Sequence, residues 1–225
     1  MNQKQLVGER AAQFVKDGMV VGLGSGSTVF YTIQKLGQLV HEGLSIQGIP
    51  TSVKTEQLAR QVGIPLADFK SINGIDVAID GADEVDSNMD LIKGGGGSLL
   101  REKIIDNAAN EFIVVADAGK LVKKLGAFRL PVEVVPFGME LTVRQITELG
   151  GVPRLRETGG RPFITDNGNL IVDCDFGPIG NSNELEASLN KIPGVVENGL
   201  FVGIADKVVT LDSEGKALVL NRNSI

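Results

Sequence analysis

Residues 22–28, with the sequence GLGSGST, combine three glycines with three hydroxyl side chains. They follow a short apolar run and precede apolar residues at three- and four-residue spacing, so we predict that they connect a strand to a helix. Amide groups at a helix start have no partner within the helix, and the helix dipole favours an anion there. Because the hydroxyls can add donors, we predict that this segment binds a phosphate. A tight turn without a ligand is the alternative.

Two other glycine-rich nucleotide-binding motifs do not fit the chain. In the dinucleotide fingerprint G-x-G-x-x-G, the third glycine after Gly22 and Gly24 would fall at Ser27. The end of the next predicted strand carries residues 50–52 (PTS) in place of a ribose-binding acid. Neither Gly-Lys pair of the chain is followed by the Ser or Thr of a Walker A loop. The sequence therefore disfavours a nicotinamide-dependent enzyme.

An acidic segment, residues 80–86 with the sequence DGADEVD, directly follows an apolar run over 75–79 that is predicted to be a strand. In open parallel sheets, ligands bind beyond the carboxyl ends of the strands, so this segment has the right position for a site. Its carboxylates could bind Mg²⁺ or Ca²⁺, or they could perform acid–base catalysis. A solvated acidic turn is the alternative, and the residue types leave all three interpretations open.

A third segment places Lys93 before four successive glycines, residues 94–97, and ahead of a helix predicted over 98–109. Four glycines are costly in chain entropy, so they indicate that the backbone approaches a ligand or another chain closely. Glu102 lies about one turn into the helix, and helical side chains lean toward the N-terminus. We therefore expect Glu102 to reach toward the glycines and Lys93, where its carboxylate could act as a base. An ordinary exposed helix glutamate is the alternative.

Lys120 is a fourth candidate because it follows an apolar strand predicted over residues 112–116. At the carboxyl end of a strand, its ammonium group could neutralise a phosphate or stabilise an oxyanion. A solvated loop lysine is an equally good interpretation of this position.

The elements that must position these segments alternate between strands and helices in the first half of the chain. The predicted strands cover residues 19–21, 46–49, 75–79 and 112–116, and the predicted helices cover 27–40, 53–62 and 98–109. Repeated strand–helix units with nearly continuous apolar strands indicate a parallel sheet covered by helices on both faces. Too few such units are present for an eightfold barrel.

From residue 131 the predicted order changes to strand, helix, strand, strand, helix, strand, which is the split motif of ferredoxin-like domains. A turn signal at 166–169 separates two strand-like runs within 163–174, and 195–202 is predicted as one strand. We therefore predict an α/β fold with two domains. Residues 1–129 plus 201–225 form a Rossmann-like parallel-sheet domain, and residues 130–200 form a smaller inserted α+β domain.

Composition excludes several classes of function. Lys and Arg total 22 and Asp and Glu total 28, and the net charge of −6 disfavours broad binding to nucleic acid or to an anionic membrane. Cys174 and His41 are the only residues of their types, so an internal disulfide and a His/Cys zinc site are excluded. No apolar run approaches the length of a signal peptide at the N-terminus or of a membrane span. We expect a soluble cytoplasmic protein.

Taken together and in this order, the four segments resemble ribose-5-phosphate isomerase of the A type. Further matching motifs are residues 101–103 (REK), 130–134 (LPVEV), 165–169 (TDNGN), 192–196 (IPGVV) and 199–201 (GLF). The resemblance covers nearly the whole chain. Ser25 is a modest departure, because Thr is commoner there in the family, but it keeps the hydroxyl.

The resemblance implies interconversion of D-ribose 5-phosphate and D-ribulose 5-phosphate without a metal or an organic cofactor. It implies that Glu102 is the proton acceptor and that Asp80, Asp83 and Lys93 assist catalysis. It also implies a fold of a Rossmann-like domain plus a smaller α+β domain, and homodimers or homotetramers. The implied substrate-binding positions are Ser25, Gly26, Ser27, Thr28, Asp80, Gly81, Ala82, Asp83, Lys93, Gly94, Gly95, Gly96 and Lys120.

The residue types suit this chemistry. Aldose–ketose isomerisation moves a proton between C1 and C2 through an enediolate, so it needs a base over the carbons and charge stabilisation at the oxygens. Glu102 can move the carbon proton, and Lys93 with the glycine amides can stabilise the oxyanion. Asp80 or Asp83 can assist ring opening and proton movement between the oxygens, and their individual roles stay open.

Three other functions are weighed against this one. A sugar-phosphate sensor that regulates transcription would need a helix-turn-helix segment, but the first predicted strand already begins near Met19. A CoA-transferase-like enzyme, in which a glutamate attacks a thioester, would need a CoA pocket and normally a longer chain. A divalent-metal enzyme using Asp80, Asp83 and Asp86 would lose its activity on exhaustive chelation.

Overall fold

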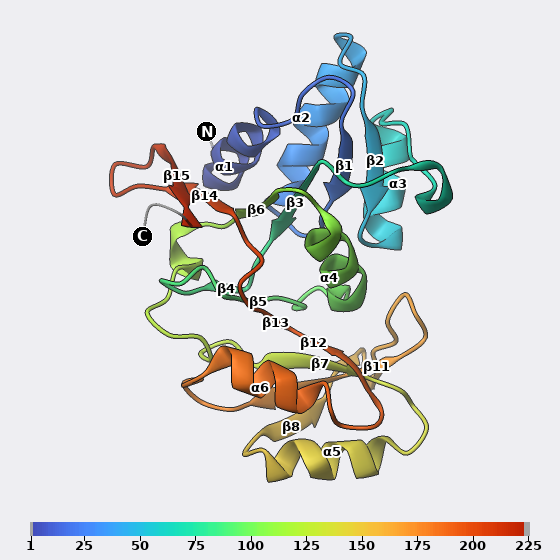
Figure 1. Ribbon diagram of the computed structural model, residues 1–225, viewed down its shortest axis with the longest axis vertical. Coiled ribbons are helices and arrows are strands. Elements are labelled where there is room, and N and C mark those ends of the chain that lie inside the picture. The colour runs from blue at the N-terminus through green and yellow to red at the C-terminus, as the bar shows by residue number, and fades with distance from the viewer. Residues whose placement is uncertain (1, 223–225) are drawn as a thin grey trace. The chain divides into compact units, whose positions relative to one another are not determined.

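A computed structural model describes residues 2–222, which fold into two compact units (Figure 1). Unit 1 contains the chain up to Ala82, Arg101–Leu121 and the chain from Ile204 onward. Unit 2 contains Asp83–Leu100 and Val122–Gly203. Each unit has a hydrophobic core of its own.

Unit 1 is built on a six-stranded sheet with the order β15-β14-β6-β3-β1-β2 (Figure 1). Its strands are β1 (Val20–Leu23), β2 (Gln47–Pro50), β3 (Val77–Gly81), β6 (Phe112–Val115), β14 (Lys207–Leu211) and β15 (Ala217–Asn221). All pair in parallel except β15, which is an antiparallel edge strand. The chain passes from β1 outward to β2 and then returns to the other side of β1 for β3. The topological switch point of the sheet therefore lies between β1 and β3, where open α/β sheets bind their ligands.

Helices cover both faces of this sheet. They are α1 (Gln3–Ala12), α2 (Val29–His41), α3 (Val53–Gln61) and α4 (Leu99–Ala108). Val21 and Leu23 of β1 belong to a core cluster that includes side chains of α1, α2 and α3. Gly22, between them, faces the other way, and a Cβ on it would lie 2.6 Å from Ile105 of α4. The first three helices therefore pack on one face and α4 packs on the other, as the doubly wound prediction requires.

Unit 2 contains a four-stranded antiparallel sheet with the order β12-β7-β11-β8. In chain order its elements are β7 (Leu130–Val134), α5 (Met139–Glu148), β8 (Val152–Leu155), β11 (Leu170–Asp175), α6 (Ser182–Leu189) and β12 (Val195–Asn198). This order of elements is the split β-α-β-β-α-β motif. The predicted fold class, a parallel-sheet domain with a smaller α+β domain, is confirmed.

A second, smaller sheet in unit 2 has the order β13-β5-β4. Its strands are β4 (Glu84–Val85), β5 (Leu91–Ile92) and β13 (Leu200–Phe201). The predicted boundaries assign residues 83–100 and 122–129 to the larger domain, whereas by contact they group with unit 2. Strand pairing links 83–100 to the rest of unit 2, because β5 pairs with both β4 and β13, and hydrogen bonds from residues 126 and 128 to Glu84 link 122–129 to it.

Two local predictions are wrong, and a third segment contains a strand that was not predicted. The single strand predicted over 195–202 is split into β12 and β13, which lie in different sheets. The first strand-like run within 163–174 forms only an isolated bridge from Ile164 to Leu170, and the hairpin before it consists of β9 (Glu157–Thr158) and β10 (Arg161–Pro162). Strand β4 lies inside the acidic segment 80–86, for which no strand is predicted. For the first of these, pairing with distant strands overrides the local pattern, since β12 pairs with β7 and β13 with β5.

The core of unit 2 includes Cys174 on β11. Burial, and secondarily the charge of Asp173, raises the pKa of the Cys174 thiol to about 12. The thiol is therefore protonated at neutral pH. Within residues 2–222, no helix is both long enough and apolar enough to cross a bilayer.

Candidate active site

The carboxyl ends of β1 and β3 meet at the switch point of unit 1. Asp80, at the end of β3, is fully buried (0% exposed). Its Oδ1 accepts hydrogen bonds from the amides of Ser25 at 2.9 Å and Gly81 at 2.6 Å. A Cβ on Gly24 would lie 2.2 Å from that oxygen, so glycine is required there by close approach. The structure thus brings together the first two segments that the sequence singled out.

The Ser25 hydroxyl lies in a cluster of hydroxyl groups from the loop after β2 and the start of α3. Its Oγ is 2.9 Å from Thr51 Oγ1, 2.9 Å from Ser52 Oγ and 3.0 Å from Thr55 Oγ1. Thr55 Oγ1 also donates to the Gly24 carbonyl at 2.9 Å. Both the amide and the hydroxyl of Ser25 are therefore engaged within unit 1, where they fix the shape of the glycine segment.

Residues 26–28 present the groups that suit an anion. They directly precede α2, where amide groups have no acceptor within the helix and the dipole favours negative charge. Across residues 2–222, no amide donates a capping hydrogen bond to the Thr28 side chain. Lys4 Nζ donates to Ser27 Oγ at 2.9 Å, so an ammonium group stands beside the same segment. Amides, hydroxyls and one cation at a helix start make a phosphate-binding arrangement.

Helix α4 carries the candidate base. Glu102 is only 4% exposed, which is contrary to the ordinary exposed glutamate that was the alternative. Asp106, one turn later, is also buried. Glu102 belongs to unit 1 and Lys93 to unit 2, so the predicted approach of Glu102 to the glycines and Lys93 stays a prediction.

Lys120 ends the short 3₁₀ helix Ala118–Lys120, which follows β6 in unit 1. It is partly buried rather than fully solvated. Its amide donates to the Asp117 carbonyl at 3.0 Å, which fixes the backbone at this strand end. Gly81 and Ala82, which follow Asp80, are also partly buried.

In unit 2, Asp83 is joined to the glycine loop, the name used below for residues 94–97. The Gly95 amide donates to Asp83 Oδ2 at 2.7 Å. The Asp83 amide in turn donates to the Ile92 carbonyl at 2.8 Å, so both ends of the residue are held. The acidic segment and the glycine loop, which are separate in the sequence, are therefore one local structure.

Lys93 is a buried lysine, 2% exposed, at the end of β5. Its amide donates to the Gly199 carbonyl at 2.9 Å, and its Nζ lies 5.3 Å from the centre of the Phe201 ring. An ammonium group over an aromatic face is stabilised by about 2 kcal/mol when both are desolvated. The Gly199 amide donates to the Pro131 carbonyl at 2.8 Å. The LPVEV and GLF motifs therefore hold the backbone of Lys93 in place, and the GLF motif also supplies the ring beside its ammonium group.

Two carboxylates of the acidic segment stabilise the fold by accepting hydrogen bonds from backbone amides. Glu84 is buried, and its two oxygens accept the amides of Gly126 and Phe128, each at 2.7 Å. Asp86 Oδ1 accepts the amides of Asn88 and Asp90, which closes the turn between β4 and β5. Within residues 2–222, no group of three or more His, Cys, Asp or Glu side chains is arranged to hold a metal ion.

The TDNGN motif is tied to a buried glutamate on β7. Glu133 Oε1 accepts hydrogen bonds from Thr165 Oγ1 at 2.9 Å, Asn167 Nδ2 at 3.2 Å and Asn169 Nδ2 at 2.9 Å. These bonds anchor the turn after Phe163, and the Phe163 ring occupies the space where a Cβ on Gly97 would stand, 2.4 Å away. The motif therefore positions the Phe163 ring against Gly97, while Asp83 binds the loop at Gly95.

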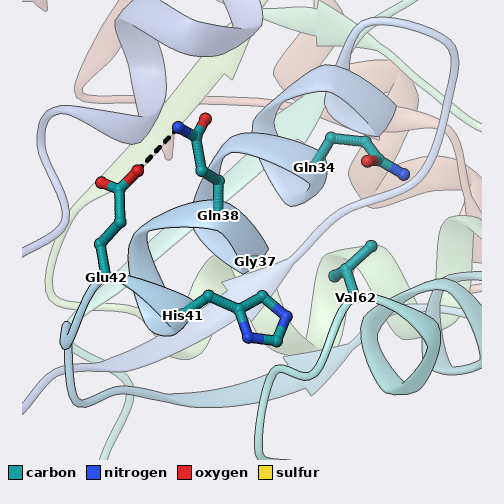
Figure 2. Close-up of a pocket in the computed structure, with 6 residues that line it drawn as sticks. All are labelled: Gln34, Gly37, Gln38, His41, Glu42 and Val62. Atoms are coloured by element: carbon teal, nitrogen blue, oxygen red, sulfur yellow. Dashed lines mark hydrogen bonds between the residues drawn. The ribbon is translucent and has the colours of Figure 1, made fainter.

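A cavity of about 420 Å³ lies away from these residues, along α2 and Val62 (Figure 2). It is lined by Gln34, Gly37, Gln38, His41, Glu42 and Val62. Figure 2 shows Gln38 bonded to Glu42, and the His41 side chain extends toward Val62. No predicted site residue lines this cavity.

Sequence reasoning missed Lys4 and the hydroxyls of Thr51, Ser52 and Thr55. The hydroxyls had a usable signal, because they follow β2 and polar residues at strand ends of a parallel sheet often face the site. Lys4 had none, since its role depends on how α1 packs beside the start of α2.

Comparison with known proteins identifies the family of the chain. The model of ribose 5-phosphate isomerase A (phosphoriboisomerase A) matches residues 47–215. The ribose-5-phosphate isomerase A of Bacillus mycoides (strain KBAB4) is 54% identical over 210 residues, which is 93% of this chain and 95% of the relative.

Solved structures agree with the sequence comparisons. Ribose 5-phosphate isomerase A from Methanocaldococcus jannaschii matches with a TM-score of 0.92 at 46% identity, over 97% of this chain and 98% of that chain. A D-ribose-5-phosphate isomerase in complex with phospho-erythronic acid matches with a TM-score of 0.94 at 41% identity, over 98% of this chain and 100% of that one.

Proposed function

The chain belongs to the ribose 5-phosphate isomerase A family, and from this membership we propose that it interconverts D-ribose 5-phosphate and D-ribulose 5-phosphate with Glu102 as the base. The reaction is an aldose–ketose isomerisation. Glu102 takes the proton from C2 of the aldose, which leaves an enediolate, and returns it to C1 to give the ketose. No electrons leave the substrate, and the reaction balances with two proton shifts: one from C2 to C1 through Glu102, and one from the C2 hydroxyl to the oxygen on C1.

The phosphate of the substrate is assigned to unit 1. The amides of Gly26, Ser27 and Thr28, with the Thr28 hydroxyl, supply neutral donors at the start of α2. Lys4, hydrogen-bonded to Ser27, supplies a positive charge, and Lys120 is a second candidate cation. Binding energy gathered at the phosphate holds the reacting carbons in place.

The developing negative charge on the sugar oxygens is assigned to Lys93 and to the amides of the glycine loop. Asp80 and Asp83 remain the two candidates for ring opening and for proton movement between the oxygens. Gly81 and Ala82, between these two aspartates, stay proposed as substrate-binding positions.

The observation that carries this proposal is the burial of Glu102 and Lys93. Glutamate and lysine are almost never fully buried in proteins unless they are paired, so their burial marks a region where charged groups are held in place. Here their exposed fractions are 4% and 2%, and they are the base and the cation that the isomerisation requires. Burial also strengthens electrostatic interactions, so a buried ammonium group stabilises the negative charge of an enediolate more strongly than one in water does.

One assay tests the proposal directly. The purified chain is incubated with ribose 5-phosphate in excess EDTA, and the ketose is measured with time. We expect steady formation of ribulose 5-phosphate that chelation does not slow. Binding of ribose 5-phosphate without any ketose would overturn the assignment and support a sugar-phosphate-binding regulatory domain instead.

A second measurement uses phospho-erythronic acid, the ligand in one of the solved relatives. Its planar carboxylate resembles one end of an enediolate, and analogues of such intermediates bind more tightly than substrates. We expect competitive inhibition of this chain with an inhibition constant below the KM for ribose 5-phosphate. Non-competitive inhibition would place the ligand elsewhere.

We also propose a homo-oligomer in the cytoplasm. Support for the oligomer comes from apolar side chains that are exposed around α5: Phe137 is 93%, Leu141 61% and Val152 62% exposed. Large exposed apolar patches mark protein–protein or membrane interaction sites. Sedimentation equilibrium of the wild type and of Phe137→Ser would test it, and a monomeric wild type would contradict it.

A further inference from the structure

The glycine loop is contacted by one arginine from a distant part of unit 2. Arg156 lies between β8 and β9, and its Nη1 donates to the carbonyl of Gly94 at 2.9 Å and to that of Gly95 at 3.1 Å. The same guanidinium group donates through Nε and Nη2 to the two carboxylate oxygens of Asp173 on β11, at 2.9 and 2.5 Å. One edge of the guanidinium is thus fixed to the sheet and the other holds the loop.

The peptide group between Gly94 and Gly95 links Arg156 to Asp83. Its carbonyl accepts from Arg156, and its N–H donates to Asp83 Oδ2 at 2.7 Å. A peptide group is planar and rigid, so fixing the carbonyl also fixes the direction of the N–H. A cation at the carbonyl polarises the group and makes its N–H a stronger donor to the carboxylate.

The aromatic ring of Phe163 completes this arrangement. The Phe163 amide donates to the Arg156 carbonyl at 2.8 Å, and the Arg156 guanidinium carbon lies 5.9 Å from the centre of the ring. The ring also packs against Gly97, at the far end of the glycine loop. The loop is therefore held at both ends by one short segment of chain.

We propose that Arg156 is a positioning residue of the isomerase, which holds the glycine loop and orients the Asp83 carboxylate through the Gly94–Gly95 peptide. This inference rests on the proposed function. Arg156 makes no bond to substrate in this proposal. It acts on catalysis because the loop amides must already point at the oxyanion when charge develops. Arginine is required, since lysine has no planar fork with which to bridge a carboxylate and two carbonyls.

The first test is steady-state kinetics of Arg156→Ala and Arg156→Lys. Misplacement of reacting groups by about 1 Å can cost roughly 10²-fold in rate, so we expect kcat to fall roughly 10- to 100-fold in both variants. KM should change by less than about threefold, because the phosphate is assigned to unit 1. The matched control is Arg154→Ala, an exposed arginine two residues away on β8, which should keep wild-type kinetics.

Two readouts separate positioning from loss of folding. Added methylguanidinium should restore part of the kcat of Arg156→Ala but none of that of Arg156→Lys, whose side chain still fills the site. The Cys174 thiol, buried on the same sheet, should stay as unreactive in both variants as in the wild type. Should Arg156→Ala fail this folding control, Arg156→Lys decides the question by itself.

A double-mutant cycle locates the effect. The losses of kcat in Arg156→Ala and Asp83→Asn should be far from additive, because both act through one peptide group. Wild-type kcat in Arg156→Ala, or strictly additive losses in the double variant, would overturn the proposal.

Hydrogen exchange at the Gly95 amide, followed by NMR, is independent of activity. We expect exchange to be faster in Arg156→Ala than in Arg154→Ala. Equal exchange would overturn the inference even if the enzyme is active. If the wild type does not isomerise ribose 5-phosphate, the proposed function fails, and this exchange measurement still decides whether Arg156 holds the loop.

Discussion

The two glycine-rich segments of the molecule are held in different ways. Residues 22–28 are fixed by groups at neighbouring strand ends of one parallel sheet, Asp80 after β3 and the hydroxyls after β2. The glycine loop at 94–97 is fixed by side chains from two other parts of unit 2: Asp83, and the segment that carries Arg156 and Phe163. A strand–helix turn in a parallel sheet carries its own supports, because the fold brings neighbouring strand ends together. A loop between small elements depends on long-range side chains.

The difference also predicts which loop tolerates change. At Gly24 the nearest atoms are those of Asp80, whose carboxylate is itself bound to two amides. The Asp80 side chain therefore cannot move aside to make room for a Cβ without breaking these bonds. At Gly97 the nearest atoms are those of the Phe163 ring, which is a side chain and can turn aside. The first segment is a rigid anchor, and the second is adjustable and depends on its supports.

The largest effect is expected when the proposed catalytic base is replaced, rather than a residue that holds a loop or the phosphate. Glu102→Gln removes the base in unit 1 and leaves both loops intact, so kcat should fall by at least roughly 10²-fold. Binding of phospho-erythronic acid, measured by calorimetry, should persist because the phosphate anchor is unchanged. Near-normal turnover in this variant would remove Glu102 from its role.

Alanine at three glycines tests the contrast between the loops. Gly24→Ala should destabilise the protein by roughly 3 kcal/mol, because its Cβ meets a fixed carboxylate. Gly97→Ala should cost about 1–2 kcal/mol, since its φ of +86° is unfavourable for alanine but the Phe163 ring can move.

Gly96→Ala is the matched control, because a Cβ there would meet no heavy atom within 4 Å among residues 2–222. Its free energy of unfolding in urea should stay within about 0.5 kcal/mol of the wild type. Equal losses at Gly24 and Gly96 would contradict the distinction between a rigid and an adjustable loop.

Lys4→Ala weakens the anchor without touching either loop backbone. Loss of one charge-assisted hydrogen bond should raise KM for ribose 5-phosphate roughly tenfold with little change in kcat. The increase should shrink at high salt, which screens the interaction. Lys16→Ala, at an exposed position in the same N-terminal region, should leave KM unchanged, and a kcat effect in Lys4→Ala would argue against a pure anchoring role.

The smallest effect concerns the sheet beneath the glycine loop. The pKa of Cys174 is about 12 in the folded protein, above the value of about 8.5 for an unfolded thiol. The unfolded state therefore loses this proton first, and the free energy of unfolding should fall as pH rises from about 9 toward 12. Labelling of the native thiol by iodoacetamide at pH 9 should be much slower than in denaturant. Equal rates would show that this sheet is not closely packed.

Much of the fold follows from local patterns. The buried strands of unit 1 are short apolar runs, and their alternation with helices predicts the doubly wound sheet without any knowledge of contacts. The first glycine segment and Asp80 are predictable for the same reason, because topology alone brings the ends of β1 and β3 together. Even the inserted domain is readable, since its order of elements is a known motif.

The remainder depends on pairings that no local pattern encodes. In the sequence, Glu84 looks like one more acidic residue, yet it accepts hydrogen bonds from two amides that lie 42 and 44 residues away. Arg156 reads as an ordinary charged residue in a polar stretch, and its partner Gly94 is 62 residues distant. Lys4 has the pattern of an ordinary lysine on a surface helix. Each acquires its role from tertiary packing, which periodicity and spacing do not report.

A crystal structure with phospho-erythronic acid bound tests the central claim most directly. The phosphate should lie on the amides of residues 26–28 beside Lys4, and the Glu102 carboxylate should lie within roughly 3.5 Å of the carbons that correspond to C1 and C2 of the sugar. A well-ordered ligand whose reacting end lies far from Glu102 would contradict the account.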